Sequence, residues 1–272
     1  MATIYATASE FQNFPTGLEV ADLVAGGTPA QQAAELGLIL QQASSAIDQW
    51  TYQPLYAHTN TETTHVRPGP YSTLTVRVSQ FPLASVTSAQ WRQTPRGGWN
   101  TIDLSLIDVF GTLGEGHKYV AGDTNYAVRG GWGLAPLTVQ STYVAGYPNM
   151  LLTAAATAAA TTFTVDTVLG VQTGQTLNVY DGANYEMVTV ASASGSTLTL
   201  SAPAVYAHGA GVRISAVPDA VNLACLLTAA YLLKERRTAG YVMGGKIQST
   251  NALTAEDLQL ARQYLQPFRR VI

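Results

Sequence analysis

Residues 217–237 read VPDAVNLACLLTAAYLLKERR, and this is the most apolar stretch of the 272-residue chain. Its apolar part runs for 13 residues, from Val221 to Leu233, and includes Asn222 and Thr228. A helix that crosses a bilayer needs about 20 predominantly apolar residues. The stretch is therefore too short for a membrane span, and we expect a buried helix that starts at Pro218.

The predicted helix is apolar around most of its circumference. Leucines lie outside its main apolar stripe, which consists of Val221, Ala224, Cys225, Thr228, Tyr231 and Leu232. A helix of this kind must be covered on several sides. We therefore expect the stripe to lie in the core and at a contact between identical subunits.

Capping signals place the other helices. The motif TPAQ at residues 28–31 combines an N-cap threonine, a proline at the first helical position and a capping-box glutamine. Apolar residues at spacings of four and three continue from there to Trp50, which predicts one buried helix face. Thr7 and Glu10 predict a shorter helical turn, and the last helix runs over residues 254–265 until Pro267 stops it.

Two regions read as β structure. Residues 64–147 contain alternating segments such as STLTVRVSQFPL and LTVQSTYVAGYP. Residues 150–215 follow with short alternating pairs separated by Asp-Gly and Ser-Gly turns, which predicts an inserted all-β module, a small barrel or a sandwich. The expected fold class is α+β: an α-helical core with an associated β-sheet region over residues 1–149 and 216–272, interrupted by the module.

Charge is sparse and unevenly placed. Charged residues make up 11% of the chain and the net charge is −3, which disfavours a general nucleic-acid binder. The chain after Arg213 contains seven basic and four acidic residues, so this tail carries a net charge of +3. This distribution favours docking onto an acidic partner surface, although a solvated helix face explains it equally well. The single cysteine fits a reducing compartment, and the N-terminus lacks the features of a signal peptide.

The sequence predicts no catalytic, cofactor or metal site. Zinc-protease, nucleophile-elbow, phosphate-loop and paired-cysteine motifs are absent, and no two of the four histidines share a ligand-type spacing. These histidines are read as surface residues, and Asp181 and Glu186 as a hairpin turn and the start of the next strand. Cys225 lies among apolar neighbours, where a thiol is inert. We therefore expect a protein that is not an enzyme.

Five segments together resemble the head–tail adaptor (connector) proteins of long-tailed bacteriophages. They are AIDQWTYQPL, LTVRVSQFPLASVTSAQW, LTVQSTYVAGYP, VPDAVNLACLLTAAYLLKERR and DLQLARQYLQPFRRVI. The resemblance covers about three quarters of the chain. Members of the family usually pass from the YVAGY-like strand almost directly into the VP-x-A-V helix, and the roughly 65 residues between them here support an insertion.

The resemblance implies a structural virion protein that assembles in the host cytoplasm. Such adaptors form a ring, usually of twelve copies, under the portal protein, hold stopper or tail-completion proteins below, and line the channel through which double-stranded DNA leaves. The expected portal-contacting segment is Leu265, Pro267, Phe268, Arg269, Arg270, Val271 and Ile272. The inserted module is a candidate for capsid contact or for bracing a neighbouring subunit. Two alternatives stay open: a carbohydrate- or surface-binding virion module that acts through the insert, and an enzyme.

Overall fold

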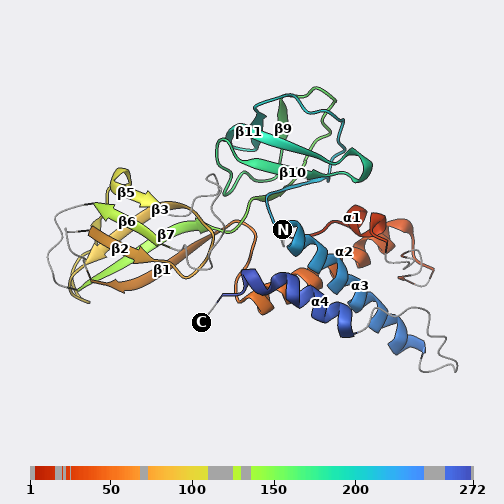
Figure 1. The fold of residues 1–272 in the computed structure, drawn as a ribbon, viewed down its shortest axis with the longest axis horizontal. Coiled ribbons are helices and arrows are strands. Elements are labelled where there is room, and N and C mark those ends of the chain that lie inside the picture. Colours follow the sequence, from red (N-terminus) through yellow and green to blue (C-terminus); the bar gives the residue numbers. More distant parts are fainter. Residues whose placement is uncertain are drawn as a thin grey trace.

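The computed structural model describes residues 4–15, 20, 23–24, 26–67, 73–109, 125–129, 136–241 and 255–270. Figure 1 shows three bodies: a β-sandwich on the left, a small β module at the top, and a group of helices at the lower right. Each body surrounds its own cluster of buried apolar residues. The chain starts and ends in the helical body and passes through the other two between these ends.

The helical body consists of α1 (Ala8–Asn13), α2 (Pro29–Thr51), α3 (Asp219–Tyr241) and α4 (Ala255–Leu265). Both predicted capping boxes at the starts of α1 and α2 are confirmed, with the side chain and backbone of Thr7 and of Thr28 paired reciprocally with the third helical residue. Residue 254, the predicted start of the last helix, lies outside the described residues. Leu36, Leu40 and Ile47 of α2 are buried against α3, as their spacing predicts.

Helix α3 is covered within a single chain. Val221 and Cys225 are fully buried and Thr228 is 6% exposed, while Tyr231 and Leu232 are partly buried. The cover comes from α2 and α4. The part of this helix up to Lys234 is therefore covered without a neighbouring subunit, and a contact between copies along its stripe stays a prediction.

The β-sandwich is built from two antiparallel sheets. One has the order β1 (His58–Val66), β7 (Leu137–Ala145), β3 (Leu83–Arg92) and β4 (Asn100–Thr101). The other has the order β2 (Thr73–Arg77), β6 (Asn125–Arg129) and β5 (Ile107–Val109). The alternation of Leu74, Val76 and Val78 is confirmed, since these side chains are buried in the shared core.

The β module is a single curled sheet between residues 149 and 215. Its strand order is β8 (Asn149–Leu151), β13 (Arg213–Ser215), β10 (Thr176–Tyr180), β11 (Glu186–Ser194), β12 (Thr197–Leu200) and β9 (Thr162–Thr164). An isolated bridge between Leu152 and Val165 brings the two outer strands together. The first and last strands of the module pair with each other, so the chain enters and leaves at one point.

The expectation of an α-helical core is wrong. The described part of the chain is mostly β, and two of its three apolar clusters lie in sheets, while its four helices surround only the third. The helices gave the strongest periodic signal in the sequence, whereas the strands are short and rich in threonine. Sequence periodicity therefore led to an overestimate of how much of the core the helices form. None of the helices in the described part of the chain combines the length and hydropathy that a bilayer crossing requires.

Candidate docking site at the C-terminal face

The C-terminal segment folds back onto the end of α2. A 3₁₀ turn, Gln266–Phe268, follows α4 directly. Beyond it, the backbone N–H of Arg270 donates to the carbonyl oxygen of Thr51 at 2.9 Å, and Nε2 of Gln53 donates to the carbonyl oxygen of Phe268 at 3.4 Å. The segment is therefore held in place by the chain itself.

Arg269 is fixed over two aromatic rings. Its guanidinium carbon lies 5.3 Å from the ring centroid of Trp50 and 5.1 Å from that of Tyr52. Its Nη2 also donates to the Tyr52 hydroxyl at 3.2 Å. The arginine is nevertheless exposed. Tryptophan, tyrosine and arginine are enriched among the residues that dominate the binding energy of protein interfaces.

Tyr52 adopts an unusual backbone conformation. It caps the C-terminus of α2 with φ 60° and ψ 23°, in the left-handed region. Glycine usually takes this position, because it has no Cβ and a Cβ in this conformation costs roughly 1–2 kcal/mol. The tyrosine side chain is 46% exposed and so contributes little to the core. Its contact with Arg269 gives a reason for a tyrosine at a position where glycine is more stable.

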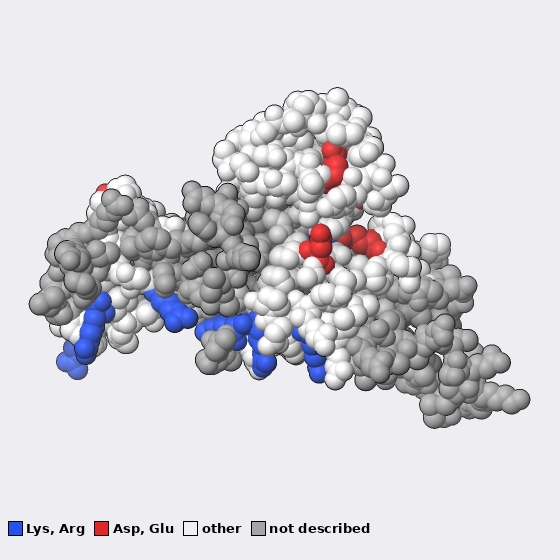
Figure 2. Space-filling view, in the orientation of Figure 1, with Lys and Arg blue, Asp and Glu red and all other residues white. Residues whose placement is uncertain are grey.

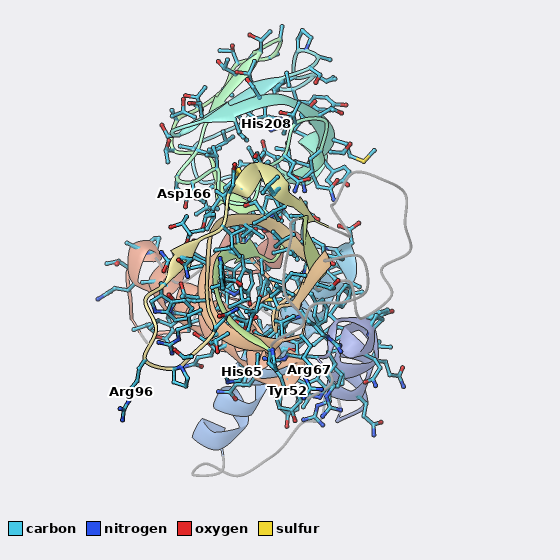
Figure 3. The ribbon with its side chains drawn as sticks, turned by 90° about the vertical axis from the view of Figure 1, so that its left-hand side faces the viewer. Tyr52, His65, Arg67, Arg96, Asp166 and His208 are labelled. Carbon is cyan, nitrogen blue, oxygen red and sulfur yellow. The ribbon has the colours of Figure 1, made fainter. Side chains whose placement is uncertain are left out.

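Positive charge gathers on this side of the molecule. Figure 2 shows Lys and Arg side chains along the lower edge, while the visible acidic side chains lie higher, most of them on and below the β module. Figure 3 places Tyr52, His65 and Arg67 in the lower part of the molecule and Asp166 and His208 in the module above. We call the surface formed by Trp50, Tyr52 and residues 266–270 the C-terminal face. Its positive charge suits it to an acidic partner surface.

The predicted site residues fall into different environments. Leu265 is 2% exposed and belongs to the helical core, so it does not present its side chain to a partner. Phe268 is partly buried, with its ring edge-on to Tyr147 at 6.5 Å. Pro267 and Arg269 are exposed and Arg270 is partly buried. Val271 and Ile272 lie outside the described residues. Trp50 and Tyr52, which sequence reasoning left out of the site, complete it.

The one cysteine lies in the core of the helical body. Cys225 is fully buried in α3, with its sulfur 3.5 Å from Oγ of Ser44. Burial raises the pKa of its thiol to about 11, with a smaller opposing effect of the Ser44 hydrogen bond. The thiolate is therefore scarce at neutral pH and the residue is unreactive.

A buried polar network, which the sequence did not predict, joins the β module to the helices. The guanidinium of Arg213 in β13 donates to both carboxylate oxygens of Glu10, at 3.0 Å from Nε and 2.5 Å from Nη2. Nδ2 of Asn222 in α3 donates to the same carboxylate at 2.8 Å. The ring of Tyr180 lies 3.8 Å from the guanidinium carbon, and its hydroxyl donates to Asp219 at 2.5 Å.

The network holds a permanent charge in the protein interior. Burial alone lowers the pKa of Arg213, but the hydrogen bonds and charge of Glu10 outweigh burial and raise it. The two residues are 203 positions apart. The one available clue was that Arg213 is the only basic residue between Arg129 and Lys234 and follows apolar Val212 in a strand.

A second cluster lies inside the β module. Nδ1 of His208 is 2.9 Å from Oδ2 of Asp181, and Nε2 is 2.6 Å from Oε1 of Glu186. Each nitrogen of the ring therefore contacts a different carboxylate. Glu186 also accepts the backbone N–H groups of Val205 at 2.8 Å and Tyr206 at 3.3 Å. Burial raises the pKa of Glu186, but these hydrogen bonds together lower it below the ordinary value.

This cluster corrects part of the sequence interpretation. The reading of the histidines as surface residues is wrong for His208, which is 2% exposed. The turn at Asp181-Gly182 is confirmed, since Gly182 has φ 55° and opens a short 3₁₀ turn. Within the described residues, no three His, Cys, Asp or Glu side chains are arranged to hold a metal ion. The cluster acts as a brace for the loop at residues 204–208.

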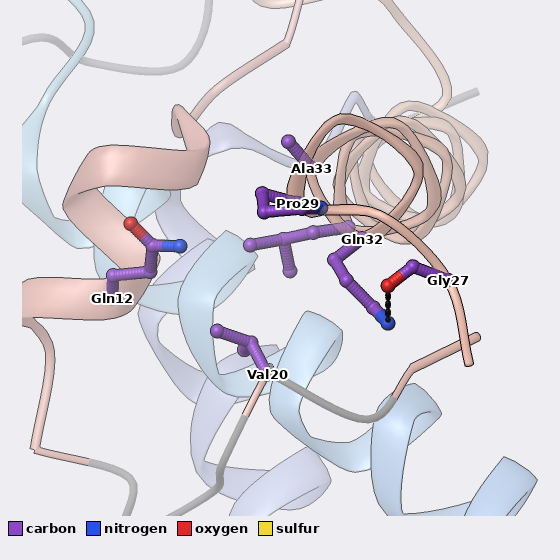
Figure 4. Close-up of a pocket in the computed structure, with 7 residues that line it drawn as sticks. Gln12, Val20, Gly27, Pro29, Gln32 and Ala33 are labelled. Atoms are coloured by element: carbon purple, nitrogen blue, oxygen red, sulfur yellow. Dashed lines mark hydrogen bonds between the residues drawn. The ribbon is translucent and has the colours of Figure 1, made fainter. Parts of the chain in front are cut away.

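A surface pocket of about 320 Å³ lies between α1 and the start of α2 (Figure 4). Its wall is formed by Gln12, Val20, Gly27, Pro29, Gln32, Ala33 and Leu36. The Gln32 amide is engaged with the backbone, since Nε2 donates to the carbonyl oxygens of Val24 at 2.7 Å and Gly27 at 3.5 Å. None of the lining side chains is ionisable, so the pocket offers no acid–base chemistry.

Comparison with known proteins identifies no relative: no family model matches the chain, and no curated protein matches it.

Proposed function

We propose that this protein is a structural docking protein of a bacteriophage virion, the adaptor of a head-to-tail connection. In this role it forms a ring under the portal protein and links the portal to stopper or tail-completion proteins around the DNA exit channel. The resemblance of the five segments supports this family and a ring of about twelve copies. The Tyr52–Arg269 contact supports a docking surface on the C-terminal face.

The observation that carries the proposal is the Tyr52–Arg269 contact. Tyr52 is held in a left-handed backbone conformation, and its side chain fixes an exposed arginine. Fixing this side chain before binding reduces the entropy lost on association. Trp50 beside it completes a Trp, Tyr and Arg group. An acidic surface on the portal is the partner that this group suits.

The proposed ring does not depend on hiding α3. This helix is already buried by α2 and α4 of its own chain. Neighbouring copies therefore meet through surfaces that the folded monomer exposes. A heterologous contact, repeated around an axis, closes such a ring.

The test is binding of the purified full chain to the portal protein of the same virion. We expect the double variant Arg269→Glu, Arg270→Glu to keep its thermal unfolding midpoint and lose portal binding. The matched control is Arg96→Glu, because Arg96 is also exposed but lies in the loop between β3 and β4. Equal portal binding by the wild type and the double variant would refute the docking role of the C-terminal face.

A further inference from the structure

The outer face of the sheet β1-β7-β3-β4 carries a row of nitrogen-bearing side chains near one end of the sandwich. Thr138 of β7 pairs with His65 of β1 on one side and with Arg92 of β3 on the other. Residues that lie opposite each other in antiparallel strands place their side chains on the same face of the sheet. The Thr138 hydroxyl lies 3.2 Å from Nδ1 of His65. Thr138 is therefore flanked by a histidine and an arginine.

Arg92 is held in place without using its hydrogen-bond donors. Its guanidinium carbon lies 4.3 Å from the centroid of the Trp99 ring. Its Nε is shielded from solvent and has no hydrogen-bond partner, and Arg92 forms no ion pair within the described part of the chain. Stacking uses the flat face of the guanidinium and leaves the terminal N–H groups at its edge free to donate. A fixed cation with free donors is suited to an oxyanion.

The rest of this face is polar and uncharged. Two further cross-strand rows continue along it, and they contain Thr61, Thr63, Ser88, Gln90, Gln140 and Thr142. All six side chains are at least partly exposed. The one acidic residue of β1, Glu62, lies on the opposite face of the strand and accepts the N–H of Ser79 at 2.8 Å. The three rows therefore offer hydrogen-bond donors to an anion and no carboxylate that would repel it.

Further positive charge lies at the same end of the sandwich. Arg67 follows β1 directly, Arg96 lies in the loop between β3 and β4, and both are exposed. Figure 3 looks onto this end and shows His65 and Arg67 in the lower part of the molecule and Arg96 at the lower left. From here β7 runs toward the β module (Figure 1), whose one basic residue, Arg213, is buried. The field of the sandwich therefore attracts an anion to the end that carries the row.

A phosphodiester backbone suits this face better than a protein surface does. Phosphates of nucleic acids are bound by arginine and also by neutral serine, threonine and glutamine side chains. The buried centre of a protein interface is apolar and rich in aromatic residues. The three rows contain no large apolar side chain. Their composition therefore favours nucleic acid as the partner.

We propose that the outer face of this sheet contacts the backbone of double-stranded DNA, with Arg92 and His65 on either side of one phosphate above Thr138. The contact reads no base sequence, because it involves only the backbone. It is weak, in agreement with the net charge of −3, and so leaves the duplex free to move. The phosphate site rests on the geometry of the sheet. The choice of double-stranded DNA rests on the proposed function, which places the chain around the DNA exit channel.

The test is fluorescence anisotropy of a short labelled duplex of random sequence, titrated with the full chain at several salt concentrations. We expect a dissociation constant on the order of 10⁻⁴ M at low salt. Arg92→Gln should weaken binding about tenfold, since a hydrogen bond to a charged group is lost. It should also lower the slope of log K against log salt by about one. The thermal unfolding midpoint should not fall, because Nε of Arg92 has no partner to lose.

Three matched variants separate the row from general charge. Arg77→Gln removes an exposed arginine from the opposite sheet, and Arg269→Gln removes another arginine that stacks on aromatic rings. Each should change the dissociation constant by less than about twofold, because salt screens exposed charges outside the contact. Arg92→Lys keeps the charge but loses the planar, stacked donor. It should weaken binding and keep the salt slope.

A second measurement reports on the contact without a variant. The Nε–H of Arg92 is shielded from solvent, so it exchanges slowly and gives an NMR signal of its own. We expect this signal to shift when the duplex is added to the wild-type chain. A duplex that binds without moving it would place the DNA elsewhere on the molecule and overturn the proposal.

The other outcomes decide as clearly. A wild-type chain that does not bind the duplex at low salt, or equal losses from Arg92→Gln and Arg77→Gln, would overturn the proposal. Binding to heparin with no binding to the duplex would assign the face to acidic polysaccharide instead. Failure here is distinguishable from failure of the proposed portal docking, because the assay contains no portal. Portal binding depends on Arg269 and is measured separately.

Discussion

Arg213 of β13 and Glu10 of α1 form a two-point ion pair in the interior, with 1% and 9% of their side chains exposed. The pair joins the β module to the first helix, and Asn222 of α3 donates to the same carboxylate. The chain enters and leaves the module at one point, and the position of this pair explains how the module is held in a fixed orientation.

Loss of one partner of this pair should destabilise the protein strongly. Arg213→Ala leaves the Glu10 carboxylate buried without its cation, and breaking a buried pair in this way costs about 3–5 kcal/mol. We expect a fall of this size in the free energy of unfolding, measured by urea denaturation. Adding Glu10→Gln should recover part of the loss, because the unpaired charge is then gone. An Arg213→Ala variant within 1 kcal/mol of the wild type would contradict the assigned role of the network.

Tyr52→Gly should separate stability from docking. Glycine adopts φ 60° without strain, so we expect the free energy of unfolding to rise by about 0.5–1 kcal/mol. Portal binding should weaken at the same time, because Arg269 loses its support. Tyr52→Phe keeps the ring and the strain but removes the hydroxyl, and serves as the matched variant. A Tyr52→Gly variant with a lower free energy of unfolding would show that the tyrosine side chain stabilises the fold.

Asp48 should make stability depend on pH in the mildly acidic range. Burial raises the pKa of Asp48 from 3.8 to about 6, although the hydrogen bond from the Tyr5 hydroxyl lowers it. Between these two values the folded protein binds more protons than the unfolded chain. The stabilising contribution of the protonated group is therefore complete below about pH 4 and is lost as the pH rises through 6.

The variant Asp48→Asn removes this titration. Its amide oxygen still accepts the hydrogen bond from Tyr5, so we expect greater stability than the wild type at pH 7 and a difference that shrinks toward pH 4. Urea midpoints at several pH values between these limits measure the effect. A difference that does not change with pH would assign the titration to other groups.

Gly146 should not tolerate a side chain. It has φ 94°, and a Cβ at this position would overlap the backbone of Tyr56 and Ala57. We expect Gly146→Ala to cost several kcal/mol, since the obstructing atoms are main chain. Gly37→Ala in α2 is the control, because nothing lies within 4 Å of its added Cβ. That change should stabilise the helix by about 0.5–1 kcal/mol, and equal thermal midpoints for the two variants would contradict this reading.

Local structure was predictable from the sequence where the signal is local. Capping boxes fixed the starts of α1 and α2, and alternation fixed Leu74, Val76 and Val78 as core residues. In the module, alternation also identified buried pairs such as Leu177 and Val179.

Long-range pairing was not predictable in this way. β1 pairs with β7 across more than 70 residues, from a threonine-rich stretch whose start at His58 shows no apolar alternation. The clusters around Glu10 and His208 likewise form only when distant segments meet. The proposed docking site was predictable in part, because the positive charge of the tail is visible in the sequence. Its aromatic residues, Trp50 and Tyr52, lie at the C-terminal end of α2, far from the tail in the sequence, so the sequence did not link them to Arg269.

The central claim is that this chain is the adaptor between a phage head and its tail, docked to the portal through the Tyr52–Arg269 face. The most direct measurement is a cryo-electron microscopy map of the neck of the virion that contains this protein. The account predicts a ring of copies directly below the portal, with Arg269 against acidic portal residues. A neck map in which no density fits this fold, or in which the C-terminal face points away from the portal, would contradict it.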